Sequence, residues 1–265
     1  MMNHNPAQHG DAKQTANKAS ALIAPDNFPL AYYNMPKAAC TTIKNILFRI
    51  QHGTWNTDPV GIHRQIRFDD VLLRGQAFSA HRKLKRFDRP YIVFTFVRDP
   101  SARAYSAFVE KIWATGSYAF PRIRELLARS FGFTLPALEN GNATPQEVGA
   151  GFRQFLRFVA DNLAGKTPTP VNAHWAVQSR RIHSARPHDT LGFVGRVENF
   201  AEDMSYLLHR AGWDDPTITG QRYNEGPRPP FTLHEVMDGD TARLLKQIYR
   251  DDYTAFDYRA PGEGA

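Results

Sequence analysis

Residues 91–100 read YIVFTFVRDP, and this stretch decides the fold. Its first seven residues are β-branched or aromatic without interruption, which is typical of a strand buried on both faces of a sheet. A turn follows at Asp99-Pro100, and the apolar residues from Tyr105 to Ile112 then recur with the spacing of a helix. The stretch therefore predicts a buried strand that passes through a tight turn into a helix.

The same arrangement stands earlier in the chain. Residues 28–35 are apolar and aromatic and predict a short buried strand, and the apolar stripe from Ile43 to Ile50 predicts a helix that ends at Gly53. A third strand is expected at residues 191–194. Repeated strand–helix units indicate an α/β fold with a central parallel sheet flanked by helices.

Composition narrows the class of protein. The chain has 265 residues, of which 42% are hydrophobic and one is a cysteine, so a core is expected and a disulfide-stapled secreted scaffold is excluded. Residues 25–260 are expected to form a single domain, and residues 1–24, which are mainly polar, a disordered tail. No run approaches the roughly 20 apolar residues of a membrane-spanning helix. These features predict a cytoplasmic protein without a transmembrane segment and leave peripheral membrane contact open.

The formal net charge of +7 is concentrated in one segment. Between Arg74 and Arg103 the chain has eight basic residues and two acidic ones, Asp88 and Asp99. Such a segment is compatible with a solvated surface, a nucleic-acid contact or a pocket for a small anionic ligand. Charge alone does not distinguish these three roles.

The turn after the first predicted strand, residues 36–42, reads PKAACTT and predicts a cradle for an anion. Small residues leave backbone N–H groups accessible, the following helix points its positive end at the turn, and two threonines add hydroxyl groups. It is not a Walker loop, because GxxxxGK[ST] is absent and the lysine stands at the front of the turn. An ordinary turn with a surface lysine is the alternative. The residues of the predicted cradle are Lys37, Ala38, Ala39, Cys40, Thr41 and Thr42.

A second group of candidate ligands follows the strand at residues 91–97. Arg98 stands at the carboxyl end of this strand, and Ser106 lies about two turns into the next helix. Ligands of open α/β sheets bind outside the carboxyl ends of the strands, so Arg98 and Ser106 are expected to converge on one phosphate. Asp99 is expected to cap the turn, and Arg103 either to bind an anion or to lie on a solvated helix face.

At these two motifs the chain resembles a known family. Pro36-Lys37-Ala-Ala-Cys-Thr-Thr is similar to the 5′-phosphosulfate loop of carbohydrate sulfotransferases that use 3′-phosphoadenosine 5′-phosphosulfate (PAPS). Val97-Arg-Asp-Pro-x-x-Arg-x-x-Ser106 is similar to their 3′-phosphate motif. The likeness covers residues 28–258 and is nearest to the Golgi heparan, chondroitin and dermatan enzymes and their bacterial relatives. It implies the sulfotransferase fold, an α/β fold with a P-loop-like central parallel sheet flanked by helices.

The resemblance implies sulfuryl transfer from PAPS to a hydroxyl group, with 3′-phosphoadenosine 5′-phosphate (PAP) as the other product and no metal ion. In such a transfer the bridging oxygen of the leaving phosphate gains charge, and the Lys37 ammonium is expected to stabilise it. Thr41 and Thr42 with the loop N–H groups would hold the 5′ end, and Arg98 and Ser106 the 3′-phosphate. The implied acceptor is a saccharide or glycolipid, and an acidic one would suit the basic segment.

The acceptor hydroxyl needs a general base. In heparan 2-O-sulfotransferase-like members a histidine upstream of the second strand has this role, and the resemblance implies it for His81. The cationic neighbours Arg82 and Lys83 would keep its imidazole neutral near pH 7. His174, which stands before Trp175, is the competing candidate for the base. A histidine in a basic surface loop and a packed, hydrogen-bonded histidine are the respective alternatives.

The resemblance also extends to residues expected on the acceptor side of the site. His174, Arg196 and Glu198 are the candidates for acceptor binding. Arg196 and Glu198 follow a predicted strand end and are expected to form an ion pair, with a purely structural role as the alternative.

Two other functions are compatible with the sequence. A divergent P-loop-type kinase would require Mg²⁺ and ATP, but a Walker lysine and an acidic magnesium ligand after a strand are missing. A nucleic-acid-binding protein would use the basic segment, and its affinity would fall steeply with salt. The basic residues stand at strand-end and turn positions without recognisable aromatic platforms, so no nucleic-acid partner is expected.

Overall fold

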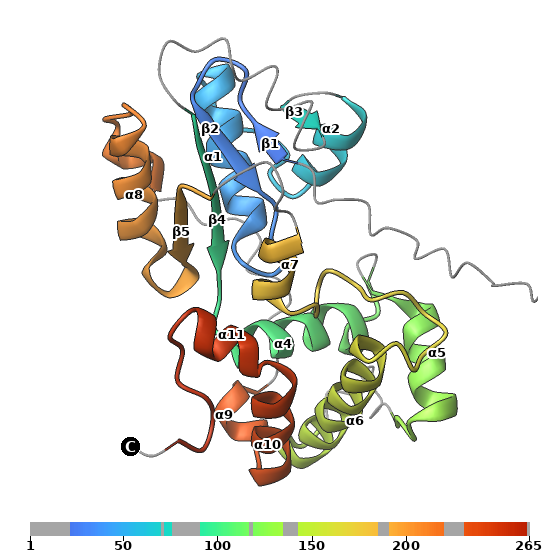
Figure 1. The fold of residues 1–265 in the computed structure, drawn as a ribbon. Coiled ribbons are helices and arrows are strands. Elements are labelled where there is room, and N and C mark those ends of the chain that lie inside the picture. The colour runs from blue at the N-terminus through green and yellow to red at the C-terminus, as the bar shows by residue number, and fades with distance from the viewer. Residues whose placement is uncertain are drawn as a thin grey trace, which may run out of the picture.

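The computed structural model describes residues 22–69, 72–75, 91–116, 119–134, 143–184, 191–219 and 231–263, whose arrangement is shown in Figure 1. Their strands and helices in chain order are β1 (Leu22–Ala24), β2 (Leu30–Tyr33), α1 (Cys40–His52), α2 (Ile62–Phe68), β3 (Leu73–Gly75), β4 (Ile92–Val97), α4 (Pro100–Phe108), the π-helix η1 (Val109–Trp113), α5 (Pro121–Ser130), α6 (Pro145–Leu163), α7 (Gln178–Ser184), β5 (Phe193–Arg196), η3 (Val197–Asn199), α8 (Phe200–Arg210), η4 (Pro216–Thr219), α9 (Leu233–Val236), α10 (Gly239–Ile248) and α11 (Arg250–Ala255).

The sheet formed by the described residues has five strands in the order β3-β1-β2-β4-β5. Strands β2, β4 and β5 are parallel, with Leu30 opposite Ile92 and Val97 opposite Arg196. This arrangement confirms the predicted parallel centre of the sheet. Strand β1 is antiparallel to both β2 and β3, so the sheet as a whole is mixed rather than parallel.

Strand β1 also changes where the folded domain begins. Leu22, Ile23 and Ala24 belong to the expected disordered tail, yet each is at most 4% exposed. A run of three apolar residues is too short to show a strand period, and it is pairing with β2 and β3 that places these residues in the core. The domain therefore starts before residue 25. Residues 1–21 of the expected tail lie outside the described residues.

Helices cover the sheet and form a further layer beyond its carboxyl ends (Figure 1). Helices α1, α2 and α8 pack on one face of the sheet, around Phe94 and Phe96 of β4. Helices α4, α5, α6 and α10 share a separate core with Trp175. Because β2 leads into α1 and β4 leads into α4, both predicted ligand-binding turns lie where the sheet meets this helical layer.

Local signals account for several helix ends. Gly53 ends α1 with a φ of 72°, and Asp99 caps α4 by accepting from Ala102 N–H, as the sequence predicts. Thr232 forms a capping box with Glu235 at the start of α9, which stops at Val236 because Asp238 caps a new helix, α10. Asn199 makes no side-chain cap to α8. None of the helices in the described segments is long and apolar enough to cross a membrane.

Candidate functional site

The turn between β2 and α1 has a backbone suited to an anion. Lys37 and Ala39 both have positive φ angles, of 66° and 55°, and Ala38 separates them. This conformation is strained for residues with a side chain and concentrates at functional sites, where successive N–H groups form a concave surface for anions. Helix α1 begins at Cys40 and adds the positive end of its dipole. Ala38 is buried, and its N–H donates to Met35 O at 3.4 Å, so Ala38 shapes the turn.

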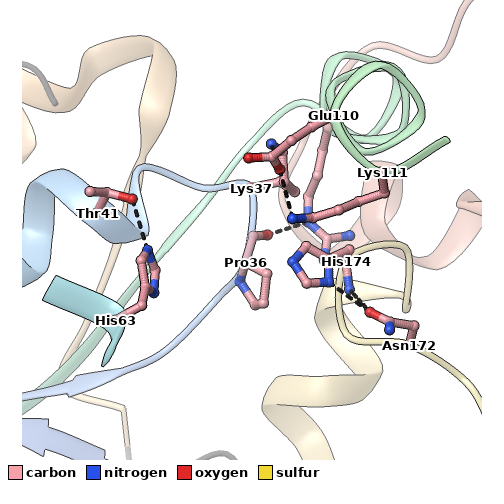
Figure 2. A network of polar contacts seen from close by, with 9 residues as sticks. Pro36, Lys37, Thr41, His63, Glu110, Lys111, Asn172 and His174 are labelled. Carbon is pink, nitrogen blue, oxygen red and sulfur yellow. Dashed lines mark hydrogen bonds and ion pairs between the residues drawn. The ribbon is translucent and has the colours of Figure 1, made fainter. Parts of the chain in front are cut away.

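Lys37 reaches from this turn to the π-helix η1. Its Nζ donates to Glu110 Oε2 at 2.6 Å, and Lys111 Nζ lies 3.2 Å from the same oxygen (Figure 2). In η1 the Ala114 N–H donates to Val109 O, five residues back, which is the wide turn that often marks functional sites. The sequence predicts Lys37 as a site residue, but it does not predict that Glu110 is the carboxylate partner of Lys37.

Burial and the neighbouring charges act in opposite directions on this cluster. Burial lowers the pKa of Lys37 and the Lys111 charge lowers it further, whereas Glu110 opposes both effects. Burial alone would raise the pKa of Glu110, but the ammonium groups of Lys37 and Lys111 outweigh burial and lower it. Two ammonium groups thus share one carboxylate beside the anion cradle, which leaves the cluster with a net positive charge.

Arg103 fastens the cradle to a second turn. It is 1% exposed, and its guanidinium donates to Pro36 O at 3.0 Å, Ala176 O at 2.8 Å and Ala173 O at 2.7 Å. Burial lowers the pKa of Arg103 to about 10, so it remains charged at pH 7. The expectation of a solvated residue is therefore wrong, and the expectation of an anion ligand stays a prediction. The Arg103 side chain donates to three carbonyl groups, and it thereby holds Pro36 against the segment that carries His174.

His174 lies in that second turn, and its ring has one defined orientation. Asn172 Oδ1 accepts hydrogen bonds from the His174 backbone N–H at 3.0 Å and from His174 Nδ1 at 2.7 Å (Figure 2). A backbone N–H only donates, so the Asn172 atom is the amide oxygen and the ring proton stands on Nδ1. The Phe120 ring packs edge to face on the imidazole, 5.4 Å between centroids. His174 Nε2 makes no hydrogen bond with the described residues and carries a lone pair.

The charge state of His174 follows from its surroundings. Burial lowers its pKa well below the usual value of 6.5, and the positive charges of Lys111, Lys37 and Arg103 lower it further. The imidazole is therefore neutral at pH 7. The sequence offers His81 and His174 as candidates for the general base. The structure places His174 next to Lys37.

His63, on α2, contacts the cradle from the opposite direction. Its Nδ1 lies 2.8 Å from Lys44 Nζ, and its Nε2 lies 3.0 Å from Thr41 Oγ1. An ammonium group only donates, so Nδ1 accepts from Lys44 and Nε2 carries the proton and donates to Thr41. Burial alone would raise the pKa of Cys40, but a hydrogen bond with His63 and the Lys44 charge outweigh burial and lower it to about 6. The second threonine, Thr42, is 5% exposed at the start of α1.

Arg98 is positioned through its backbone. Gln178 Oε1 accepts from Arg98 N–H at 3.1 Å, and Gln178 Nε2 donates to Arg98 O at 2.9 Å. Asp252, which is fully buried, accepts in turn from the backbone N–H of Gln178 at 2.8 Å. The Arg98 guanidinium makes no hydrogen bond or ion pair within the described residues. It is therefore a half-buried cation, held by its backbone, whose side-chain donors remain for a ligand.

The remaining predicted site residues that the structure describes are Ser106, Arg196 and Glu198. Ser106 is half-buried on α4. Glu198 accepts hydrogen bonds from Asp99 N–H and from Tyr258 Oη, both at 2.8 Å. Arg196 donates to Phe256 O and lies over the Tyr258 ring. The expected ion pair between Arg196 and Glu198 is absent from the described part of the chain, because each already has another partner. Neither residue contacts His174 there, so the structure does not bring the three acceptor-side candidates together.

His81, the favoured candidate for the base, lies outside the described residues. Within the described ranges, no group of three His, Cys, Asp or Glu side chains could hold a metal ion.

Four residues of this site were not found from the sequence: His63, Glu110, Lys111 and Asn172. The partners of Glu110 and His63 lie far along the chain, as with Glu110, which is 73 residues from Lys37. Lys111 and Asn172 have near partners, Glu110 and His174, but their place in the site depends on where those partners lie. The available signal was Glu110-Lys111, a pair of charged residues inside an otherwise apolar helical stretch.

Residues 20–259 match the sulfotransferase family, and because this match spans most of the sequence, the chain belongs to that family. It is 24% identical over 256 residues to carbohydrate sulfotransferase 11 of Rattus norvegicus, which covers 93% of this chain and 69% of the relative. Carbohydrate sulfotransferase 9 of Homo sapiens is 25% identical over 252 residues, 91% of this chain and 54% of the relative. Carbohydrate sulfotransferase 12 of Xenopus laevis is 28% identical over 219 residues, 73% of this chain and 49% of the relative. No solved structure gives a significant match.

Proposed function

We propose that this protein transfers a sulfuryl group from PAPS to a hydroxyl group of a saccharide or a glycolipid. The observation that carries the proposal is the position of Lys37. It stands in a left-handed turn at the carboxyl end of a parallel strand, where α1 begins, in a chain of the sulfotransferase family. The printed names of the relatives, carbohydrate sulfotransferases, support a saccharide acceptor. A cytoplasmic location stays a prediction from the sequence.

The described residues fit a donor with anionic groups at both ends. The turn at residues 37–42 offers backbone N–H groups and two threonines to the 5′ end, and the Lys37 ammonium stands beside it. Arg98 offers a guanidinium that no other described residue occupies, which suits a 3′-phosphate, and Ser106 on α4 is its expected companion. PAPS, when bound, supplies an electrophilic sulfur on a phosphate leaving group.

The residues of the chain then have separate tasks in transfer. Lys37 stabilises the charge that develops on the bridging oxygen of the leaving phosphate, since a preorganised cation there lowers the barrier. A histidine accepts the proton of the attacking hydroxyl, for which the sequence offers His81 and His174. Transfer in this form requires no metal ion, and PAP is released.

Donor preference provides the first test. The melting temperature should rise in the presence of PAP, by roughly 5–10 °C at a concentration of about 100 Kd, because a ligand that binds only the native state stabilises it. Neither 5′-AMP nor ATP with Mg²⁺ should do the same, because both lack the 3′-phosphate. A larger shift with ATP and Mg²⁺ than with PAP would favour a kinase and overturn the proposal.

Transfer itself provides the second test. The wild-type protein should move ³⁵S from labelled PAPS to desulfated chondroitin or to a neutral glycolipid, and Lys37→Ala should do so at least about 100-fold more slowly. Affinity for a single-stranded oligonucleotide that exceeds the affinity for PAP would instead support nucleic-acid binding.

A further inference from the structure

Proton transfer at this site depends on which histidine has an available lone pair. Two histidines of the described residues contact the cradle or the segment bound to it, His63 and His174 (Figure 2). His63 has both ring nitrogens in use, because Nδ1 accepts from Lys44 and Nε2 donates to Thr41. His174 uses only Nδ1, and Asn172 fixes the ring proton there.

We infer that His174 Nε2 is the proton acceptor for the acceptor hydroxyl, and that Asn172 is the positioning residue that holds the imidazole in its Nδ1–H form. This inference rests on the proposed sulfuryl transfer. When the acceptor oxygen bonds to sulfur, its proton passes to His174 Nε2. The bond between sulfur and the bridging oxygen breaks, and its electron pair leaves with the 5′-phosphate of PAP.

The position of His174 relative to Lys37 supports this role. Arg103 donates to Pro36 O, next to Lys37, and to Ala173 O and Ala176 O, on either side of His174. One buried guanidinium therefore fixes the position of Lys37, which stabilises the leaving phosphate, relative to His174. A base and an electrostatic stabiliser must be held in one geometry if both are to act in the same step.

The neighbouring charges keep His174 in the form that accepts a proton. Lys111 from η1, Lys37 from the turn after β2, Arg103 from α4 and His63 from α2 all act on it, and each disfavours the imidazolium. Glu110 is the other proton acceptor nearby, but its pKa is lowered by Lys37 and Lys111, which makes it a weak base. Glu110 Oε2 is also held in ion pairs with both ammonium groups, whereas His174 Nε2 has no hydrogen-bond partner among the described residues.

Nuclear magnetic resonance of the full chain tests the state of the ring without a donor or an acceptor. In long-range ¹H–¹⁵N spectra, assigned with His174→Gln, we expect a neutral His174 ring with the proton on Nδ1 at pH 7. Asn172→Ala should allow the other tautomer to appear. A ring that is protonated at pH 7, or that carries its proton on Nε2, would overturn the inference.

Kinetics test the role of the ring in transfer from PAPS to the acceptor that the ³⁵S assay identifies. His174→Gln should lower kcat/KM by about 10²–10⁴-fold, the usual contribution of a general base, while PAP still raises the melting temperature as in wild type. The acid limb of the wild-type kcat/KM profile should lie below pH 6.5 and be lost in His174→Gln. Asn172→Asp should move that limb to higher pH, because a carboxylate favours the imidazolium.

Controls separate the alternatives. His209→Gln, whose side chain is 83% exposed on α8, should leave the rate and the profile unchanged. If His174→Gln keeps full turnover and His81→Gln loses the acid limb, His81 is the base and the inference fails while sulfuryl transfer stands. If PAP fails to stabilise the wild-type protein and no ³⁵S is transferred, the proposed function itself fails, and the inference that rests on it falls too.

Discussion

Replacing Arg103 by methionine should loosen both turns of the site at once. The variant removes three hydrogen bonds from a charged donor, at 2.7, 2.8 and 3.0 Å, and leaves three carbonyl groups without them. Such bonds contribute about 1.5–3 kcal/mol each, or roughly 5–9 kcal/mol together. The cost of burying a guanidinium offsets part of this, so the expected net loss is ~3–5 kcal/mol of unfolding free energy.

Urea denaturation followed by circular dichroism measures this loss as a lower midpoint with an unchanged slope. The melting temperature should fall by roughly 10 °C, given about 2–4 °C per kcal/mol for a domain of this size. Arg103→Lys should recover little, because an ammonium group cannot reach three carbonyl groups in the geometry of the guanidinium fork. The matched control is Arg180→Met on α7, whose partner Asp251 lies at the surface and whose loss should cost less than about 1 kcal/mol.

Activity should fall with stability in Arg103→Met. Since Arg103 sets the position of Pro36 relative to Ala173 and Ala176, kcat/KM should drop by about 100-fold, the usual penalty of a misplacement of about 1 Å. A variant that loses no more stability than Arg180→Met would refute the claim that Arg103 fastens the two turns.

Three further outcomes are expected. Lys37→Ala should lower kcat by about 10²–10³-fold and affect the affinity for PAP less, because the lysine acts on charge that develops in the transition state. Equal losses in kcat and in the affinity for PAP would contradict this reasoning. Arg98→Ala should weaken PAP by about 10–100-fold in calorimetric titration and leave 5′-AMP unchanged; a parallel loss for 5′-AMP would place Arg98 away from the 3′-phosphate. Alkylation of Cys40 by iodoacetamide should accelerate as pH rises through about 6, since the thiolate forms above its pKa, and His63→Ala should move this rise to higher pH. PAP should protect Cys40 in the same assay, and a midpoint near pH 8.5 in the wild type would contradict the lowered pKa.

Local patterns predict the centre of the fold because they depend on near neighbours in the chain. The uninterrupted run at residues 91–97 predicts β4, which lies between two parallel strands and has Phe94 and Phe96 fully buried. Strand β1 was not predicted, because three residues are too few to show the alternation of a strand. Only its pairing with β2 and β3 defines it. Between residues 232 and 249 the chain forms two helices, because Asp238 caps α10 two residues after α9 ends at Val236.

Candidate ligands were predictable where a turn presents its own backbone. Arg98 follows β4 directly and Lys37 stands in the turn between β2 and α1, so their place at the carboxyl end of the sheet follows from the order of elements alone. The role of Arg103 was not predictable, because a helical arginine reads as a surface residue until its acceptors are known. Two of those acceptors, Ala173 and Ala176, lie 70 and 73 residues further along the chain.

The sequence by itself determined the strand–turn–helix units, the anion cradle and the lysine within it, since each rests on residue types at short spacing. Only the tertiary structure decided that Glu110 and Lys111 surround Lys37, and that Arg103 joins this turn to the segment that carries His174. The reason is physical. Hydrogen bonds and ion pairs between distant segments form wherever packing brings their atoms within about 3 Å, and no local period of the sequence records that distance.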